Sequence, residues 1–288
     1  TNDFAVMGYP NPARRGGHHR RAAGHGLQQH VGPALAAGGQ HQRVGGAVQR
    51  TQRRLVEALA IASGETVLDV AAGAGNVAIP AARTGASVIA TDLTPELLDT
   101  GRHLAAREQL DITWRTADAE ALPMPDAAFD VVTSCVGVMF APFHQRGADE
   151  ITRACRSGGR IGLINWTPTG FIGELFTTMK PYAPTPPPGA SAPVLWGDAD
   201  HVRKLFGDKL AHAEFRTEKL IVDRFDNGAE FRDFFKATYG PTIVAFRNIA
   251  DDPERVAELD AAMAALADRY LAGGVMEWEY LLMTAHIR

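Results

Sequence analysis

The chain has 288 residues, of which 45% are hydrophobic and 22% charged, a composition typical of a globular protein with a sizeable core. Its formal net charge of −4 gives no electrostatic reason to expect binding to nucleic acid or to an acidic membrane. No apolar run approaches the roughly 20 residues that span a bilayer, and the N-terminal residues lack the pattern of a secretion signal. We therefore expect a cytoplasmic protein without membrane insertion, in which Cys135 and Cys155 are reduced thiols.

Residues 1–48 do not have the pattern of a folded segment. Gly, His, Arg and Gln dominate from residue 10 onward, and no helical or strand period emerges. From Phe4 to Val56 there are eight arginines and no Asp, Glu or Lys, a strong charge asymmetry. Five of the ten histidines also lie here, but their irregular spacing without Cys or carboxylate partners does not favour a metal site. We expect a disordered or cloning-derived tail and no metal.

From residue 49 onward, short apolar strands alternate with amphipathic helices. The first helix, Gln49 to Ile61, has Leu55, Val56 and Leu59 at helical spacing. The sequence then predicts strands at 66–70, 87–91, 112–115, 129–134 and 160–166, and helices at 76–84, 95–109 and 144–155. Such alternation is typical of βαβ units, in which right-handed crossovers place helices on both faces of a parallel sheet. The ligand site of such a sheet lies beyond the carboxyl ends of the strands.

The pattern loosens after residue 166. It predicts an apolar stretch at 171–179, a stiff proline-rich loop at 182–189, helices at 199–206, 230–239 and 253–271, and strands at 215–225 and 276–287. We interpret residues 49–288 as one α/β domain with helical cap insertions at about 167–200 and 226–272. Most aromatic side chains of this half should form the core of the cap, and a few should line an apolar pocket: Phe171, Phe176, Tyr182, Trp196, Phe231, Phe234, Phe235, Tyr239 and Trp278.

The segment from Val67 to Asn76 carries the clearest chemical signal. An apolar strand ends in Asp69 and runs into small residues, which let a backbone approach a ligand closely. Gly73-x-Gly75-x-x-Ala78 also fits a dinucleotide-binding turn, with an acid at the end of the next strand, so an NAD-dependent oxidoreductase is one alternative. An acid at position 69 is unfavourable beside a pyrophosphate, however, and suits a ligand with an ammonium or sulfonium charge.

This segment resembles the first motif of the class I S-adenosylmethionine-dependent methyltransferases, with Ala71 where that family has its first glycine. Asp92 matches the family's ribose-binding acid, and the run from Asp118 to Asp130 matches the acidic segment near the adenine. The turn from Arg156 to Ile161 resembles the family's entry into its fifth strand. The resemblance covers about residues 50–166 and is strongest to small-molecule methyltransferases of bacteria, including the quinone-biosynthesis C-methyltransferases.

The resemblance implies a doubly wound, mostly parallel, seven-stranded Rossmann-like sheet and S-adenosyl-L-methionine as cofactor. The acceptor should be a small, hydrophobic or aromatic molecule methylated at O, N or C. Nucleic acid is not expected, because the folded part has no basic patch interleaved with aromatics. The implied cofactor-binding residues are Asp69, Ala71, Gly73, Gly75, Asp92, Leu93, Asp118, Ala119, Glu120 and Cys135.

No catalytic residue follows from the pattern, because alignment and exclusion of water can supply much of the rate of a methyl transfer. His144 is open to two interpretations, a base near the acceptor or an ordinary residue at the start of a helix. A non-catalytic S-adenosylmethionine-binding module is a second alternative function. The sequence does not indicate an oligomeric state.

Overall fold

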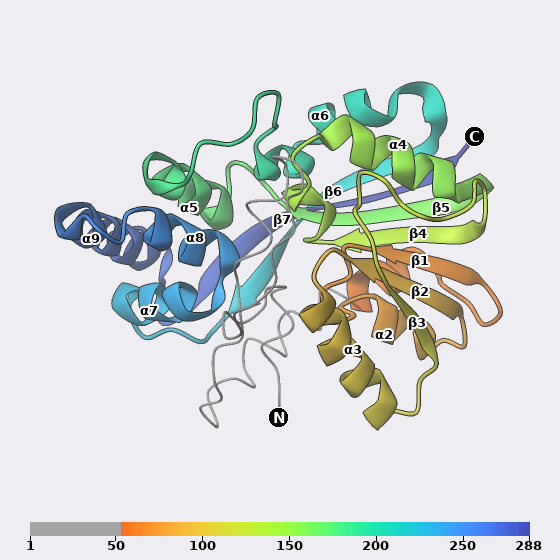
Figure 1. Ribbon diagram of the computed structural model, residues 1–288, viewed down its shortest axis with the longest axis horizontal. Coiled ribbons are helices and arrows are strands. Elements are labelled where there is room, and N and C mark those ends of the chain that lie inside the picture. Colours follow the sequence, from red (N-terminus) through yellow and green to blue (C-terminus); the bar gives the residue numbers. More distant parts are fainter. Residues whose placement is uncertain (1–52) are drawn as a thin grey trace, which may run out of the picture.

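The computed structural model describes residues 53–288, so the tail expected at residues 1–48 lies outside the described residues. Seven strands form one sheet in the order β3-β2-β1-β4-β5-β7-β6 (Figure 1). All neighbouring strands from β3 to β5 are parallel, and β7 is antiparallel to both β5 and β6. The expected mostly parallel, seven-stranded α/β sheet is therefore confirmed. The strands are β1 (Thr66–Val70), β2 (Ser87–Asp92), β3 (Ile112–Thr116), β4 (Phe129–Cys135), β5 (Cys155–Trp166), β6 (Leu210–Val222) and β7 (Met276–Ile287).

The order of the strands reverses at β1. The chain passes outward through α2 (Ala78–Ala82) to β2 and through α3 (Pro95–Arg107) to β3, then returns to pair β4 with β1. It continues through α4 (His144–Ala154) to β5 on the other side. The loops after β1 and β4 therefore leave the sheet in opposite directions, which is where an open sheet of this type binds its ligands.

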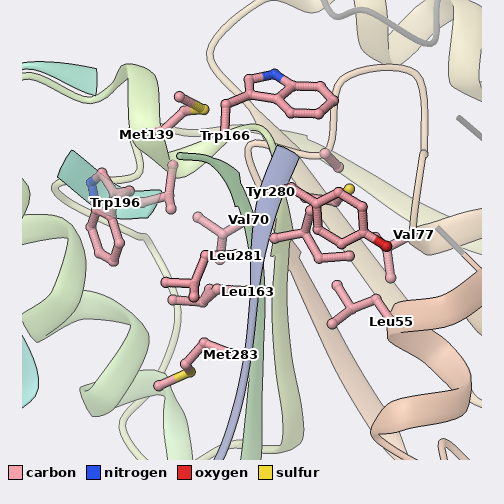
Figure 2. Packing of buried hydrophobic residues seen from close by; sticks show 14 of the residues in the cluster. Leu55, Val70, Val77, Met139, Leu163, Trp166, Trp196, Tyr280, Leu281 and Met283 are labelled. Atoms are coloured by element: carbon pink, nitrogen blue, oxygen red, sulfur yellow. The ribbon is translucent and has the colours of Figure 1, made fainter. Parts of the chain in front are cut away.

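Apolar side chains cover both faces of the central strands. Figure 2 shows Leu55, Val77 and Tyr280 on one side of β7 and Leu163, Met283 and Trp196 on the other, all of them buried. Burial on both faces explains why nearly every residue of β1 and β4 is buried, rather than every second one.

The helical residues 53–58 and the turn after them pack against β5. A Cβ added to Gly162 of β5 would lie 2.8 Å from Leu55 Cδ1 and 2.5 Å from Leu59 Cδ1. Both leucines are buried. The glycine thus makes room for this helix on the face of the sheet.

A helical cap lies at the carboxyl edge of β5 and β6. Trp166, the last residue of β5, pairs with Tyr280, so β7 extends four residues beyond it to Met276. Figure 1 shows the cap beside these projecting ends. It consists of α5 (Phe171–Met179), which follows β5, and of α7 (Gly228–Thr238), α8 (Gly240–Asn248) and α9 (Pro253–Tyr270), which connect β6 to β7. The remaining helix, α6 (Ala199–Phe206), contacts α4 through a bond from Gln145 to the Leu205 carbonyl.

Three elements differ most from the sequence prediction, and α2 is also shorter than the helix expected at 76–84. β5 begins at Cys155 rather than at residue 160, because Cys155 already pairs with Phe129 before a shift in register. β6 spans residues 210–222 rather than 215–225. α8 was not predicted, because Gly240-Pro241 is a typical helix end; here Pro241 stands in the first turn of a new helix, where no N–H is required. None of the helices within residues 53–288 has the length and hydropathy of a membrane span.

Candidate active site

The loop after β1 begins with a buried acid. The carboxylate of Asp69 accepts hydrogen bonds from the Ala78 N–H (2.8 Å) and the Thr133 hydroxyl (3.0 Å), and the Val77 N–H also points to it. Burial raises the pKa of Asp69 to about 7, although these hydrogen bonds act in the opposite direction. Asp69 therefore occupies the first N–H groups of α2. All of these hydrogen-bond partners of Asp69 belong to the protein. The contact between Asp69 and a cationic ligand, which we expected from the sequence, therefore stays a prediction.

The backbone between β1 and α2 adopts left-handed conformations at three alternate residues. The φ angles are 53° at Ala71, 57° at Gly73 and 90° at Gly75. A Cβ on Gly75 would lie 2.6 Å from the Trp114 ring, so this position requires glycine for space as well as for φ. Ala71 is an alanine in a region that L-residues seldom adopt. The loop presents backbone and methyl groups, rather than long side chains, at the carboxyl edge of the sheet.

Asp92 ends β2 beside this loop. Its carboxylate accepts hydrogen bonds from the Gly73 N–H (2.9 Å) and the Thr94 N–H (2.8 Å). Burial raises the pKa of Asp92 above the ordinary value of an aspartate, while these bonds favour its ionised form. The acid thereby joins the first loop to the start of α3, and Leu93 follows it, half-buried.

The acidic segment after β3 lies at the end of the neighbouring strand. Asp118 Oδ1 accepts a hydrogen bond from the Glu120 N–H at 2.9 Å, which forms a tight turn around Ala119. All three residues are half-buried. Glu120 points away from this turn, since its Oε1 accepts a hydrogen bond from the Phe143 N–H (2.7 Å) at the start of α4.

The end of β4 closes the other side of the edge. Cys135 is buried, and burial raises its thiol pKa, so it is unsuited to act as a nucleophile. The Ser134 hydroxyl donates to the Val70 carbonyl (2.7 Å) and accepts from the Val138 N–H (2.9 Å). A Cβ on Gly137 would lie 2.2 Å from the Ala71 carbonyl oxygen. The loops after β1 and β4 are therefore in close contact.

These groups fit an adenosyl ligand with a cationic sulfur better than a dinucleotide. Pyrophosphate would need free N–H groups at the start of α2, but Asp69 already accepts from those of Val77 and Ala78. Asp92 ends β2, and Asp118 follows the end of the neighbouring β3 by two residues. Their carboxylates can accept hydrogen bonds from hydroxyl and amino groups. None of the ten expected site residues carries a positive charge.

Comparison with known proteins agrees with this chemistry. A family model of the methyltransferase domain matches residues 68–163, from β1 to β5. A demethylmenaquinone methyltransferase of Deinococcus radiodurans is 37% identical over 134 residues, 45% of this chain and 56% of that protein. The chain belongs to the S-adenosylmethionine-dependent methyltransferases. It is accordingly an enzyme with S-adenosylmethionine as its cofactor, as the sequence predicted.

Two further comparisons show how much of this methyltransferase is covered by its similarity to other proteins. An uncharacterized protein of Mycobacterium tuberculosis is 54% identical over 231 residues, 80% of this chain and 84% of that protein. The solved structure of the YcgJ protein from Bacillus subtilis superposes with a TM-score of 0.58 at 18% identity, covering 83% of this chain and 98% of that one. The second similarity shows that the fold extends across the described residues.

His144 of the methyltransferase is a buried residue at the start of α4. Its Nδ1 lies 3.0 Å from Nε2 of His201, and its ring lies 5.4 Å from that of Trp196, centroid to centroid. Burial and the neighbouring His201 lower the pKa of His144 to about 4. The ring is therefore neutral at physiological pH.

Aromatic side chains lie between the end of β4 and the cap. Phe140, in the turn after β4, lies 6.4 Å from Phe176 of α5, and Phe176 lies 6.4 Å from Tyr239, centroid to centroid. Phe140 and Phe176 are half-buried, whereas Tyr239 is buried. Of the other aromatics expected in the cap, Phe171, Phe231, Phe235 and Trp278 form a buried cluster. Most of these side chains are thus core, and the half-buried pair borders the end of β4.

Sequence reasoning missed the residues that support the segment after β3. Arg153 of α4 donates hydrogen bonds to the carbonyls of Leu122 (3.0 Å) and Met124 (2.6 Å). The partners are backbone carbonyls about 30 residues away, so no side-chain pattern in the sequence could have indicated them. The described residues contain no group of three or more His, Cys, Asp or Glu arranged to hold a metal ion.

Proposed function

We propose that this methyltransferase holds S-adenosylmethionine at the carboxyl ends of β1 to β4 and methylates a hydrophobic or aromatic small molecule. The observation that carries the cofactor assignment is the pair of acids at the ends of β2 and β3, with the N–H groups of α2 taken by Asp69. Asp92 would accept hydrogen bonds from the ribose hydroxyls, and Asp118 from the adenine amino group. The loop from Ala71 to Gly75 would pass along the ligand with its backbone.

The remaining assigned residues would line the same pocket. Leu93 and Ala119, which directly follow the two acids, offer apolar surface to the adenosine. Cys135 ends β4 opposite the first loop and would contribute backbone and an inert thiol. Glu120 would support the pocket without contacting the ligand through its carboxylate, because that carboxylate accepts a hydrogen bond from the start of α4.

The half-buried aromatics support the choice of acceptor. Phe140 follows the strand that ends beside the cofactor loop, and Phe176 comes from the cap above the same edge. Flat apolar rings at this place favour a flat apolar acceptor. The similarity to a demethylmenaquinone methyltransferase points in the same direction.

When bound, S-adenosylmethionine would supply a methyl group on a sulfonium. A nucleophilic O, N or C of the acceptor would bond to that methyl carbon as its bond to sulfur breaks, so that S-adenosylhomocysteine leaves as a neutral thioether and the acceptor gives up its proton to the buffer. The loop after β1 and Asp92 would hold the donor in line, while the cap excludes water from the acceptor. No residue is assigned as a general base. Binding and orientation would account for the catalysis.

Transfer of a radiolabelled methyl group tests the acceptor class. Under anaerobic conditions, the protein should methylate 1,4-dihydroxynaphthalene and leave glycine and phosphoethanolamine unlabelled. Phe176→Ala should raise the KM for the naphthalene roughly tenfold, the scale of a lost apolar contact in a pocket. Phe215→Ala, on β6 beside Arg203, is the matched control and should not change it. Methylation of the polar acceptors alone would contradict the proposal.

A further inference from the structure

The segment of residues 117–128 connects β3 to β4 without a helix and carries Asp118. Its β-structure is limited to an isolated bridge between Asp118 and Ala121. A segment of this kind has few hydrogen bonds of its own to fix its shape. Asp118 itself lies in a turn closed by the Glu120 N–H at its carboxylate and the Ala121 N–H at its carbonyl. The rest of the segment, residues 122–128, is held by contacts from outside it.

Helix α4 supplies these contacts through Arg153 and Glu150. The Arg153 guanidinium donates to the carbonyls of Leu122 and Met124, and also to Asp126 Oδ1 at 2.7 Å. Glu150 Oε2 accepts from the Leu122 N–H at 2.6 Å. The two side chains bind each other through two bonds of 2.7 and 2.8 Å. Together they satisfy both backbone groups of Leu122, four residues after Asp118.

The arrangement differs from an ordinary surface ion pair. Arg153 and Glu150 are half-buried, and the side chains of Leu122 and Met124 are buried. The hydrogen bonds to Glu150 and Asp126 raise the pKa of Arg153, so it is charged at every working pH. A second contact, from Phe143 N–H to Glu120, fixes the near side of the segment to the start of the same helix.

We propose that Glu150 and Arg153 are positioning residues that give the cofactor site its preference for adenine. By holding Leu122 and Met124, they fix the turn that directs Asp118 toward the 6-amino group. This inference rests on the proposed role of Asp118 as the acceptor for that group. Hypoxanthine carries a carbonyl oxygen in place of the amino group, so a fixed carboxylate should reject it, whereas a displaced carboxylate should not.

Calorimetry with S-adenosylhomocysteine and S-inosylhomocysteine tests this directly. The unmodified protein should prefer the adenosyl ligand by at least about tenfold, the lower range for a hydrogen bond to a charged group. Asp118→Asn should abolish the preference. Arg153→Met should reduce it to less than about threefold, mainly by weakening the adenosyl ligand, and Glu150→Gln should act in the same direction.

Controls separate positioning from a general loss of stability. Arg156→Met removes an ion pair with Asp130, outside the segment, and should keep the full preference. Asp118→Asn combined with Arg153→Met should show the same ratio of affinities for the two ligands as Asp118→Asn alone, because the preference is already lost in the single variant. If Arg153→Met does not fold, Arg153→Lys and Glu150→Gln serve as the milder variants.

Two results would overturn the inference, and they are distinguishable. If Arg153→Met and Glu150→Gln keep the full preference while Asp118→Asn loses it, the assignment of Asp118 stands and the positioning role is wrong. If the unmodified protein shows no preference, or Asp118→Asn retains it, the assignment of Asp118 fails and the inference fails with it.

Discussion

At the scale of single residues, Asp69 uses its carboxylate on the protein itself, at the N–H groups of α2 and the hydroxyl of Thr133. An acid at this position could be predicted to disfavour pyrophosphate. The reason found in the structure differs from simple repulsion, because the acid takes the donors that a pyrophosphate would use. The sequence could not show this, since Thr133 is 64 residues away.

The raised pKa of Asp69 predicts a pH dependence of stability. With a folded pKa of about 7 and an ordinary value of 3.8, the folded protein binds a proton between these pH values while the unfolded chain does not. The contribution of Asp69 to the free energy of unfolding is fully present below about pH 4 and is lost as the pH rises toward 7. The free energy of unfolding of Asp69→Asn should therefore rise relative to that of the unmodified protein between about pH 4 and 7, by on the order of a few kcal/mol, and the difference should stay constant above pH 7.

Urea unfolding of both proteins across this range is the measurement. Asp111→Asn, at an exposed residue, provides the control. Its free energy of unfolding should change with pH in parallel with that of the unmodified protein. Parallel curves for Asp69→Asn as well would show that burial does not protonate Asp69.

At the scale of elements, the parallel strands could be predicted well because each is a short apolar run between turn signals. The bounds of β1 agree with the prediction, and so do those of the antiparallel β7. The start of β5 and the position of β6 could not be predicted, because Arg156 to Gly159 is polar and β6 is an exposed edge strand. Their strand structure comes from pairing with β4 and β7 rather than from local pattern.

The packing of α3 on β3 depends on a glycine that local pattern does not explain. A Cβ on Gly101 would lie 2.4 Å from two ring carbons of Trp114. Gly101→Ala should therefore lower the free energy of unfolding by about 1–3 kcal/mol through overpacking, despite the helix propensity of alanine. In a Trp114→Phe background, which lacks those ring carbons, the same substitution should be neutral or stabilising. Thermal and urea unfolding of the unmodified protein, the two single variants and the double variant measure this difference. An equal loss of stability from Gly101→Ala in both backgrounds would rule out the clash with the Trp114 ring.

At the scale of the whole molecule, the loops after β1, β2, β3 and β4 form the edge proposed to hold the cofactor, and the cap stands at the edge continued by β5 and β6. The acids of the proposed cofactor side could be placed at this edge from the sequence, because they follow strands in a fixed order. The half-buried rings near the end of β4 could not be placed, because they come from a turn and a cap helix whose packing is tertiary.

The boundary near residue 49 can be tested by truncation. Removal of residues 1–48 should leave the affinity for S-adenosylhomocysteine unchanged, because the expected site residues all follow it. Removal of residues 1–62 should impair folding, because it deletes buried Leu55 and Leu59 and the ion pair from Arg54 to Glu218. Thermal stability and calorimetry compare both with the full chain. A tenfold loss of affinity, about 1.4 kcal/mol, on removing residues 1–48 alone would make that segment part of the site.

The central claim is that the carboxyl edge of this sheet binds S-adenosylmethionine through Asp92. Calorimetry of the full chain with S-adenosylhomocysteine and with NAD, repeated on Asp92→Ala, tests it most directly. We predict binding of S-adenosylhomocysteine and none of NAD, and a loss of roughly 1.5–3 kcal/mol in Asp92→Ala, the scale of hydrogen bonds to a charged group. Binding of NAD without S-adenosylhomocysteine, or an unchanged affinity in Asp92→Ala, would contradict it.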